Sequence, residues 1–406
     1  MRAKSGYPPM NADERRKPRG NGIRGSRICD YHQYLDRISG GSAFIGVHRR
    51  IQSLLFALLC LVLAGALSPA AHAVEPSPEV AAVAALRGPE RTAKLVAGAK
   101  KEGELMVYSS LTPGDEMKLA EDFKARYGIA IRFWRGSQSN ILSRVMSETR
   151  GGRYLFDAIE TNAPQIEAIS REGLLQDVGS PHIDEELIPE TVPPSREWAP
   201  DRLNMVVFAY NTAAIRKEDL PRTWPQLLDP KWKGRIGLES TNVEWFETVV
   251  EAMGEKAGLE FFRRLGESGV AVRTGHTHST GLVIAGEIPM MIGVFSHDVD
   301  RMKPKNAPID WFVLPPAVIL PSAVGVSRRA LHPYAAALFL DYMLTDGQRF
   351  YTEVYRVPAN RSYDTPVRRL VQRGEPYSVV DARKSMDEHD KWVKLYKRLI
   401  VERSRH

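Results

Sequence analysis

The stretch GELMVYSSLTPGDEMKLAEDFKARYGIAIRFWRGS, residues 103–137, decides the fold. Residues 103–111 form an apolar run that ends in small polar residues, which is typical of a buried strand that enters a loop. Residues 113–128 have the period of an amphipathic helix that stops at Gly128, and residues 129–137 are a second apolar strand. The order strand, helix, strand predicts a parallel sheet.

The same alternation continues along the chain. Residues 139–152 are predicted to be a helix that a Ser caps, residues 155–164 a strand, and Gln165 lies in the next helix. A second set follows a Pro-rich passage at 188–200 and a long apolar strand at 203–211, with strands at 234–240, 269–275 and 287–295, helices at 244–255 and 257–268, and a helix near Gly281. Further helices are predicted at 80–101, 333–354 and 384–403. The pattern therefore predicts an α/β fold whose sheets carry helices on both faces.

A targeting segment precedes these elements. His48-Arg49-Arg50 stands before the apolar run 54–67, and small residues follow as far as Ala73. This is the order of a secretory signal peptide, and the run is shorter than the roughly 18–20 residues that span a bilayer. We expect residues 47–73 to be a cleaved signal peptide. Residues 1–46 show no helical or strand period, and we expect a non-native or disordered extension from a wrongly assigned start.

Removal of residues 1–73 changes the charge of the chain. The full sequence has 56 Lys and Arg against 49 Asp and Glu, but 11 of the basic and 4 of the acidic residues precede position 74, so 45 of each remain. A neutral chain gives no support for binding to nucleic acid or to a membrane surface. Cys29 and Cys60 also lie before the cut, which excludes disulfide, redox and zinc-thiolate chemistry from the exported chain.

The catalytic motifs of common hydrolases and kinases are absent, including the phosphate loop and the Gly-x-Ser-x-Gly elbow. Ser296, His297 and Asp298 are adjacent, but on an extended chain neighbours point to opposite faces, so the three cannot form a triad by themselves. We favour a structural or ligand-contact role for them. His276 and His278 would share one face of an extended segment and could hold a metal, but without a nearby carboxylate or Cys we favour a polar loop.

Polar residues follow four of the predicted strands, each just before a helix. In open parallel sheets such strand ends meet at the ligand crevice, and the helix starts beyond them offer free N–H groups to anions. Four loops in register across two lobes favour a ligand cleft over simple helix capping. The residues concerned are Ser109, Ser110, Thr112, Arg135, Ser137, Thr161, Asn162, Thr241 and Asn242.

The passage LPRTWPQLLDPKWKGRIGLES (220–240) resembles the entry to the second lobe of periplasmic substrate-binding proteins of the ferric-iron type, within the extracellular solute-binding proteins that serve ABC importers. Three other stretches agree with this family in the expected order: LMVYSSL (105–111), LVIAGEIPMMIG (282–293) and residues 335–362. The resemblance covers most of residues 101–365.

The resemblance implies a type II periplasmic-binding-protein architecture, with two lobes that close on a solute. Each lobe would be a mixed, mostly parallel sheet, and two crossing strands near Tyr210 and Phe312 would join the lobes. We expect lobe 1 at 101–205 plus 313–345, lobe 2 at 206–312, and a C-terminal helical segment at 346–406 that packs on the lobes.

The chain departs from the iron-binding members of this family at their ligands. Those members hold Fe(III) with two adjacent tyrosines, often with a His from the first loop and a carboxylate from the third. The resemblance places Ser296 and His297 at the tyrosine positions, Thr112 near the His and Asn162 near the carboxylate. No Tyr-Tyr pair occurs in the sequence. Hydroxyls, amides and arginines remain, and these suit phosphate or carboxylate groups.

We therefore expect the solute-binding component of an ABC importer that captures a small organic anion. It would be a periplasmic monomer without cofactor, metal or catalytic activity, its partners would be an ABC permease and the ATPase of that permease, and it would not bind nucleic acid. The alternatives are iron(III) binding through non-tyrosine ligands or a chelate, an exported ligand sensor, and a hydrolase with His297 as general base. Beyond the strand-end residues above, the expected ligand contacts are Tyr210, Ser296, His297 and Arg356, with Arg273 as a further candidate.

Overall fold

The structure is a computed structural model, and it describes residues 74–403 of the 406-residue chain. The predicted extension (1–46) and the predicted signal peptide (47–73) lie outside the described residues. Within residues 74–403, every helix is too short or too polar to cross a bilayer.

One mixed sheet runs through the described residues in the order β2-β1-β3-β10-β5-β8-β6-β7, and β4, β9, β11 and β12 pair with β5 or β10 outside this order. The strands are β1 (Glu104–Ser109), β2 (Ala130–Arg135), β3 (Ala158–Asn162), β4 (Leu175–Gln176), β5 (Trp198–Asn211), β6 (Ile236–Glu239), β7 (Ala271–Arg273), β8 (Met290–Phe295), β9 (Ile309–Phe312), β10 (Ala317–Ser327), β11 (Val357–Pro358) and β12 (Tyr377–Val379).

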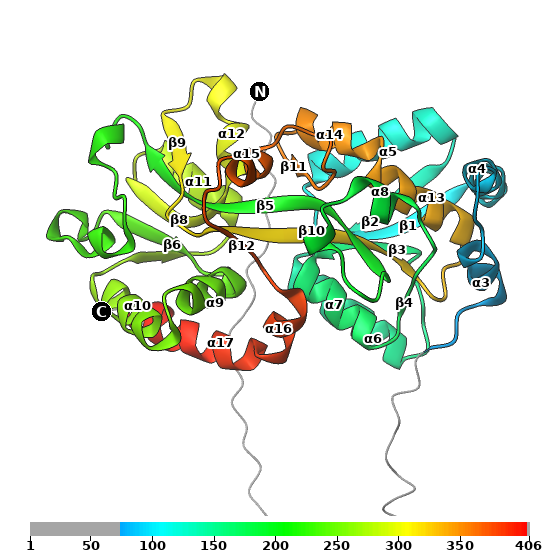
Figure 1. The fold of residues 1–406 in the computed structure, drawn as a ribbon, viewed down its shortest axis with the longest axis horizontal. Coiled ribbons are helices and arrows are strands. Elements are labelled where there is room, and N and C mark those ends of the chain that lie inside the picture. Colours follow the sequence, from blue (N-terminus) through cyan, green and yellow to red (C-terminus); the bar gives the residue numbers. More distant parts are fainter. Residues whose placement is uncertain (1–73, 404–406) are drawn as a thin grey trace, which may run out of the picture. The chain divides into compact units, whose positions relative to one another are not determined.

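The sheet consists of two parallel trios joined by an antiparallel pair. β1 pairs in parallel with β2 and β3, and β6 pairs in parallel with β7 and β8. Between the trios, β5 and β10 are antiparallel to each other and to their outer neighbours, β8 and β3. Figure 1 shows β5 and β10 running side by side from one trio to the other. This arrangement confirms the predicted α/β fold with two crossing strands.

The helices flank the two trios. The trio β2-β1-β3, with its helices, is called lobe 1, and the trio β8-β6-β7, with its helices, is called lobe 2. The helices are α3 (Pro78–Ala84), α4 (Arg91–Glu102), α5 (Pro113–Tyr127), α6 (Gln138–Arg150), α7 (Ala163–Arg171), α8 (His182–Glu186), α9 (Val243–Ala252), α10 (Glu255–Glu267), α11 (His276–Ile284), α12 (Ser296–Asp300), α13 (Pro333–Leu344), α14 (Gly347–Glu353), α15 (Pro366–Gln372), α16 (Ala382–Asp387) and α17 (His389–Tyr396). The predicted residue boundaries of the lobes stay a prediction.

Strand β1 shows why both faces of the lobe 1 sheet are covered. Leu105 and Val107 point into a core that they share with Phe123 of α5 and Phe339 of α13. Tyr108 points the other way and packs with the residues of a second core, which α6 and α7 complete. Because successive strand residues alternate between faces, a strand that is apolar on both faces has to be buried between two helical layers.

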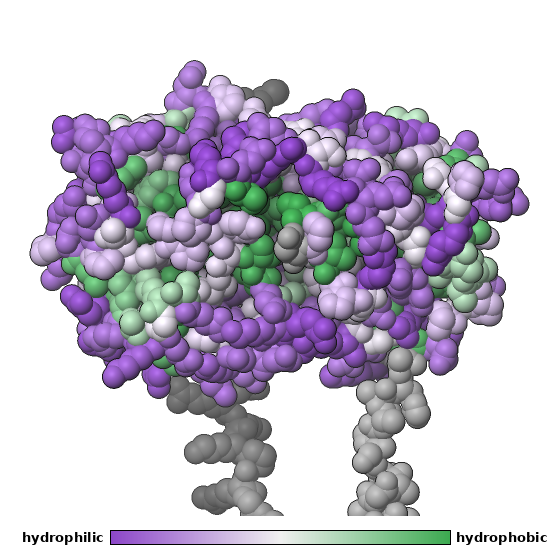
Figure 2. Space-filling model, viewed as in Figure 1, coloured by the Kyte–Doolittle hydropathy of each residue, from purple (hydrophilic) through white to green (hydrophobic). Residues whose placement is uncertain are grey.

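An aromatic core fills lobe 2. Trp245, Phe246 and Phe262 pack there with Trp392 and Tyr396 of α17. The C-terminal helices thereby contact both lobes, since α16 packs on α7 and α17 packs on α9. Figure 2 shows the same view in space-filling form: hydrophilic residues cover most of both lobes, and hydrophobic residues gather mainly across the middle, over the crossing strands.

Three predicted helices are broken in the structure. The helix expected at 80–101 is divided into α3 and α4 at Gly88-Pro89, where Gly88 has φ 77° and proline cannot donate to the preceding turn. The helix expected at 333–354 is divided into α13 and α14. The helix expected at 384–403 consists of α16, α17 and a π-helical turn at Lys397–Val401.

Other predictions about local structure were also wrong. The second crossing strand is β10, not the segment around Phe312, which pairs with Phe208 in the lobe 2 half of β5. Ser296 and His297, which follow the predicted strand and were expected to be extended, begin helix α12. His276 and His278 lie in the first turn of α11 and not on an extended segment.

Candidate ligand-binding site

A cavity of about 260 Å³ lies between the two lobes. Lobe 1 and the segments that pack on it contribute Ser110, Thr112, Arg135, Gly136, Ser137, Gln138, Asn162 and Arg356, strand β5 contributes Arg202 and Asn204, and lobe 2 contributes Gly275, His276, Thr277, His278, Phe295, His297 and Asp298. Since both lobes supply walls, a molecule in this cavity would touch both lobes at once.

Helix starts surround the cavity. The residues just before α5, α6, α7, α11 and α12 are Thr112, Ser137, Asn162, Gly275 and Phe295, and all five line it. The hydroxyl oxygens of Thr112 and Ser137 each accept a backbone N–H three residues later, at 3.3 Å. Because the first N–H groups of a helix lack partners within it and carry partial positive charge, helix starts that converge in this way favour an anion.

A hydrogen-bonded row of side chains forms part of the cavity floor. Asn204 of β5 donates to the Ser322 hydroxyl at 2.8 Å, and Ser322 of β10 donates to the Asn162 side-chain oxygen, also at 2.8 Å. The Asn162 side chain therefore points to the crossing strands and does not cap α7. The row fixes Asn162 and Asn204 at the point where lobe 1 meets the crossing strands.

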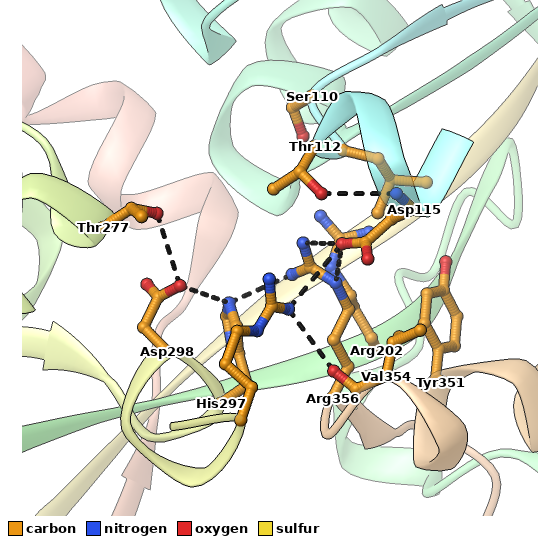
Figure 3. A network of polar contacts seen from close by, with 12 residues as sticks. Ser110, Thr112, Asp115, Arg202, Thr277, His297, Asp298, Tyr351, Val354 and Arg356 are labelled. Carbon is orange, nitrogen blue, oxygen red and sulfur yellow. Dashed lines mark hydrogen bonds and ion pairs between the residues drawn. The ribbon is translucent and has the colours of Figure 1, made fainter. Parts of the chain in front are cut away.

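Arg356 bridges the two lobes at the cavity wall (Figure 3). Its Nε and Nη2 donate to Asp115 Oδ2 at 3.0 and 2.7 Å, and its Nη1 lies 3.1 Å from His297 Nε2. Arg301, which follows α12, approaches the same oxygen of Asp115 to 3.7 Å. Asp115 stands in the first turn of α5, whereas His297 and Arg301 belong to lobe 2. These contacts hold the lobes together on this side of the cavity.

The protonation states of this group follow from burial and from the arginines. Burial alone would raise the pKa of Asp115, but the ion pair with Arg356 outweighs it and holds that pKa below its usual value. Burial, and then the charges of Arg356 and Arg301, lower the pKa of His297 well below its usual value. His297 is therefore neutral at pH 7, and its Nε2 accepts a hydrogen bond from Arg356.

Arg202 sits on a buried carboxylate pair beneath lobe 1. Its Nη1 contacts Glu160 and lies 3.3 Å from Asp201 Oδ2. Glu160 also accepts from the Ser109 hydroxyl at 3.1 Å and from the Ser110 N–H at 3.1 Å, and Tyr351 donates its hydroxyl to Asp201. Burial raises the pKa of Asp201, although the charge of Arg202 opposes the rise. The charge of Arg202 is thus fully compensated by the protein.

Arg135 differs from the other two arginines at the cavity. It lies at the end of β2, is exposed, and donates from Nε to the Leu111 carbonyl at 2.8 Å. No carboxylate of residues 74–403 forms an ion pair with it. Arg135 therefore supplies positive charge that a bound anion can use.

The lobe 2 wall is made of rings and a carboxylate. His276 stacks on Phe295 with 3.9 Å between ring centroids, and the His297 ring also stacks on Phe295, at 5.5 Å. Asp298 lies beside them, with its Oδ1 3.4 Å from the Thr277 hydroxyl. Beneath the wall, buried Glu239 accepts from the Gly275 N–H at 2.8 Å and lies 3.8 Å from His276. The sequence suggested no carboxylate near His276, but the structure brings Glu239 next to it.

The structure brings seven of the thirteen expected ligand contacts to the cavity: Ser110, Thr112, Arg135, Ser137, Asn162, His297 and Arg356. The other six expected contacts are not among the residues that line the cavity in the described part of the chain. Ser109 lies below the wall on Glu160, Thr161 and Ser296 are buried, Tyr210 packs on Phe312 in lobe 2, Thr241 donates to Glu239, and Asn242 donates to the Gly293 carbonyl. Arg273 is exposed on β7, where it donates to the Val272 carbonyl.

The structure adds lining residues that the sequence did not single out as ligand contacts. Arg202 and Asn204 lie in the buried strand β5, where polar side chains among apolar ones were the available signal. Asp298 and Thr277 face the cavity because α12 and α11 start as helices, which turns these residues inward.

The lining of the cavity does not offer the ligands of a protein-bound ferric ion. Its lining residues include Asp298 and three histidines but no tyrosine. Among residues 74–403, the group of acidic side chains close enough to share an ion is Glu247, Glu251 and Glu388, on α9 and next to α17, away from the cavity. Ferric iron prefers phenolate and carboxylate oxygens, so the cavity fits an organic anion better than the bare ion.

Comparison with known proteins identifies relatives of this chain. A family model described as bacterial extracellular solute-binding protein matches residues 159–386. The chain is 28% identical to iron uptake protein A1 of Synechocystis sp. over 162 residues, which are 39% of this chain and 44% of that protein. The match thus spans less than half the length of that relative.

Solved structures share the fold. Iron-bound HitA from Pseudomonas aeruginosa has a TM-score of 0.65 and 21% sequence identity, with 73% of this chain and 99% of that chain covered. The periplasmic binding protein AfuA from Actinobacillus pleuropneumoniae, with exogenous fructose-6-phosphate bound, has a TM-score of 0.65 and 22% identity, with 74% and 99% covered. Both structures have the fold that the sequence predicted for this chain.

Proposed function

This chain belongs to the bacterial extracellular solute-binding proteins, and from that membership we propose that it captures a small organic anion between its lobes and delivers it to an ABC permease. The observation that carries this proposal is the cavity between the lobes, where helix starts converge beside Arg135, an arginine with no carboxylate of residues 74–403 within ion-pair distance. Backbone N–H groups and a free guanidinium are the donors that bind phosphate and carboxylate groups.

The size and the rings of the cavity support an organic solute. A volume of about 260 Å³ is more than a bare inorganic ion requires, and Phe295 with its two stacked histidines offers an apolar surface to a carbon skeleton. The similar AfuA structure contains fructose-6-phosphate, an organic phosphate. Phosphorylated and carboxylated small molecules are therefore the first classes to test.

The expected partners are a membrane permease and its ATPase, which would receive the solute from the closed form of the protein. Family membership supports a periplasmic location, and we propose that residues 47–73 direct the chain there. We further propose that the protein acts as a monomer, since one chain supplies both walls of the cavity. These assignments make the protein a binding component without turnover.

Iron binding is the first alternative, because the similar HitA structure is iron-bound. For this chain it would require a chelate that brings its own oxygen ligands, as the lining residues include no tyrosine. An iron-free protein that binds a carboxylate chelator and its ferric complex equally well would argue against this alternative.

Hydrolysis with His297 as general base is the second alternative. The Nε2 atom of His297 accepts from Arg356, so its lone pair is engaged and cannot take a proton from a substrate in this arrangement. A sensor that presents its closed form to a membrane receptor remains the third alternative, and neighbouring genes for a permease and an ATPase would favour the importer.

The test is to identify and measure the bound solute. Native mass spectrometry of protein from its host should show a retained organic anion, and the mass of bare iron would contradict the proposal. In calorimetric titration, Arg135→Ala should weaken binding of that anion about 10–100-fold, since a charged hydrogen bond is lost. The matched control is Arg132→Ala, which removes an exposed arginine of the same strand that pairs with Glu104. Equal affinity of the two variants for the anion would show that Arg135 does not contribute to binding.

A further inference from the structure

Three arginines line the cavity, but the protein neutralises two of them. Arg356 is 7% exposed and directs two donors to Asp115 and one to His297. Arg202 is 3% exposed and faces both Glu160 and Asp201. Each of these guanidiniums is therefore matched by at least one carboxylate within ion-pair distance.

The remaining charges of the lining lie on different walls. Arg135 ends β2 in lobe 1, two residues before the Ser137 cap of α6, and the described residues place no carboxylate within ion-pair distance of it. Lobe 2 contributes the Asp298 carboxylate, and Asp115, whose N–H donates to the Thr112 hydroxyl at the start of α5, binds Arg356. An anionic group at Arg135 can therefore pair with that guanidinium, whereas a second anionic group at Arg356 would meet the Asp115 carboxylate that already binds it.

We propose that Asp115 determines which solutes bind, because its ion pair with Arg356 leaves that arginine unavailable to a second anionic group. The solute would then carry a single anionic group, which binds at Arg135. This inference rests on the proposed function, since it concerns the same cavity. Selection by repulsion is effective here because an unpaired charge within a desolvated site is costly. The solute class is thus a phosphomonoester or monocarboxylate with a neutral polar remainder.

The test uses matched pairs of probes that differ by one anionic group. Fructose 6-phosphate is compared with fructose 1,6-bisphosphate, and butyrate with succinate, by calorimetric titration of the full chain. The wild type should prefer the singly substituted member by about tenfold or more, and Asp115→Asn should reduce that preference by about tenfold because Arg356 is released. The control Asp122→Asn, on the outer part of the same helix α5, removes one of the two carboxylate partners of Arg126 and should keep the wild-type preference.

A second variant keeps the test decisive if Asp115→Asn does not fold. Arg356→Gln leaves the Asp115 carboxylate without its main partner, so it should increase the preference for the singly substituted probes. Equal binding of both members of a pair by the wild type would overturn the inference. So would an unchanged preference in the folded Asp115→Asn protein. Failure of all four probes to bind the wild type would instead count against the proposed organic-anion function.

Discussion

The two walls of the cavity use charge in different ways. The lobe 1 wall places hydroxyl-capped helix starts and Arg135 next to an arginine that is neutralised from below by Glu160 and Asp201. The lobe 2 wall is built on stacked rings, a neutral His297 and the Asp298 carboxylate. The difference indicates that one wall binds the charged group of the solute and the other wall selects what is attached to it.

The largest expected effect concerns the charge beneath the lobe 1 wall. Glu160→Ala removes a buried partner of Arg202 and the acceptor of Ser109 and Ser110. Breaking a buried pair leaves an uncompensated charge, so the free energy of unfolding should fall by about 3–5 kcal/mol in urea titrations.

The control for this variant is Glu104→Ala on strand β1, whose pair with Arg132 is exposed. Its loss should cost less than about 1 kcal/mol. If both variants lost equally little, the buried carboxylates would have no special part in the lobe 1 wall.

The pH dependence of stability tests the burial of Glu116 in the lobe 1 helix α5. Burial raises its pKa to about 7, and its Oε1 has no hydrogen-bond partner within the described structure. A carboxyl whose pKa is raised on folding stabilises the protein at low pH and loses this contribution as pH rises from about 4.5 to 7. Glu116→Gln should therefore gain on the order of 2 kcal/mol over the wild type at pH 8, and little at pH 4. A constant difference across that range would contradict the raised pKa.

His297 should show the opposite slope for the lobe 2 wall. Because its pKa is lowered on folding, the unfolded chain binds the proton more readily, and stability falls as pH drops below about 6.5. His297 should lower the free energy of unfolding by up to about 1.4 kcal/mol for each pH unit in that range. His297→Gln should flatten the decline in urea titrations between pH 7.5 and 5. An unchanged slope would show that folding does not lower the pKa of His297.

The smallest effect separates capping from binding. Ser137→Ala should cost about 1 kcal/mol through the lost cap of α6 and should also weaken anion binding a few-fold, because Ser137 lines the cavity. Thr365→Ala removes an equivalent cap from α15, outside the cavity, and should cost similar stability at unchanged affinity. Equal affinities for both variants would assign Ser137 to capping alone.

Much of lobe 1 could be predicted because its information is local. The apolar run that ends in Ser109, the helix face of Phe123 and the cap at Ser137 all lie within one strand–helix–strand unit, so periodicity and capping place them. The same logic brought Thr112 and Asn162 to the cavity. It failed for Thr241 and Asn242, which also follow a strand but bind buried partners there.

The long-range contacts around the cavity could not be predicted from local patterns. Asp115 and Arg356 are 241 positions apart, and Arg202 reaches Glu160 across 42. Such pairs depend on how strands from distant segments are ordered in the sheet. Asp298 was visible in the sequence, but its direction depends on whether the residues after β8 stay extended or turn into a helix, and we expected them to be extended.

The order of strands has a consequence for how the chain folds. Each trio comes from one continuous segment, but each lobe is completed by a later one: β10 (Ala317–Ser327) pairs with β3 (Ala158–Asn162) of lobe 1, and α17 (His389–Tyr396) packs into the core of lobe 2. Loop closure over so long a separation is slow, and contiguous contacts form sooner. We expect the two trios to form before the segments that complete them, so that β3 remains an open sheet edge until β10, which follows the lobe 2 strands in the chain, pairs with it.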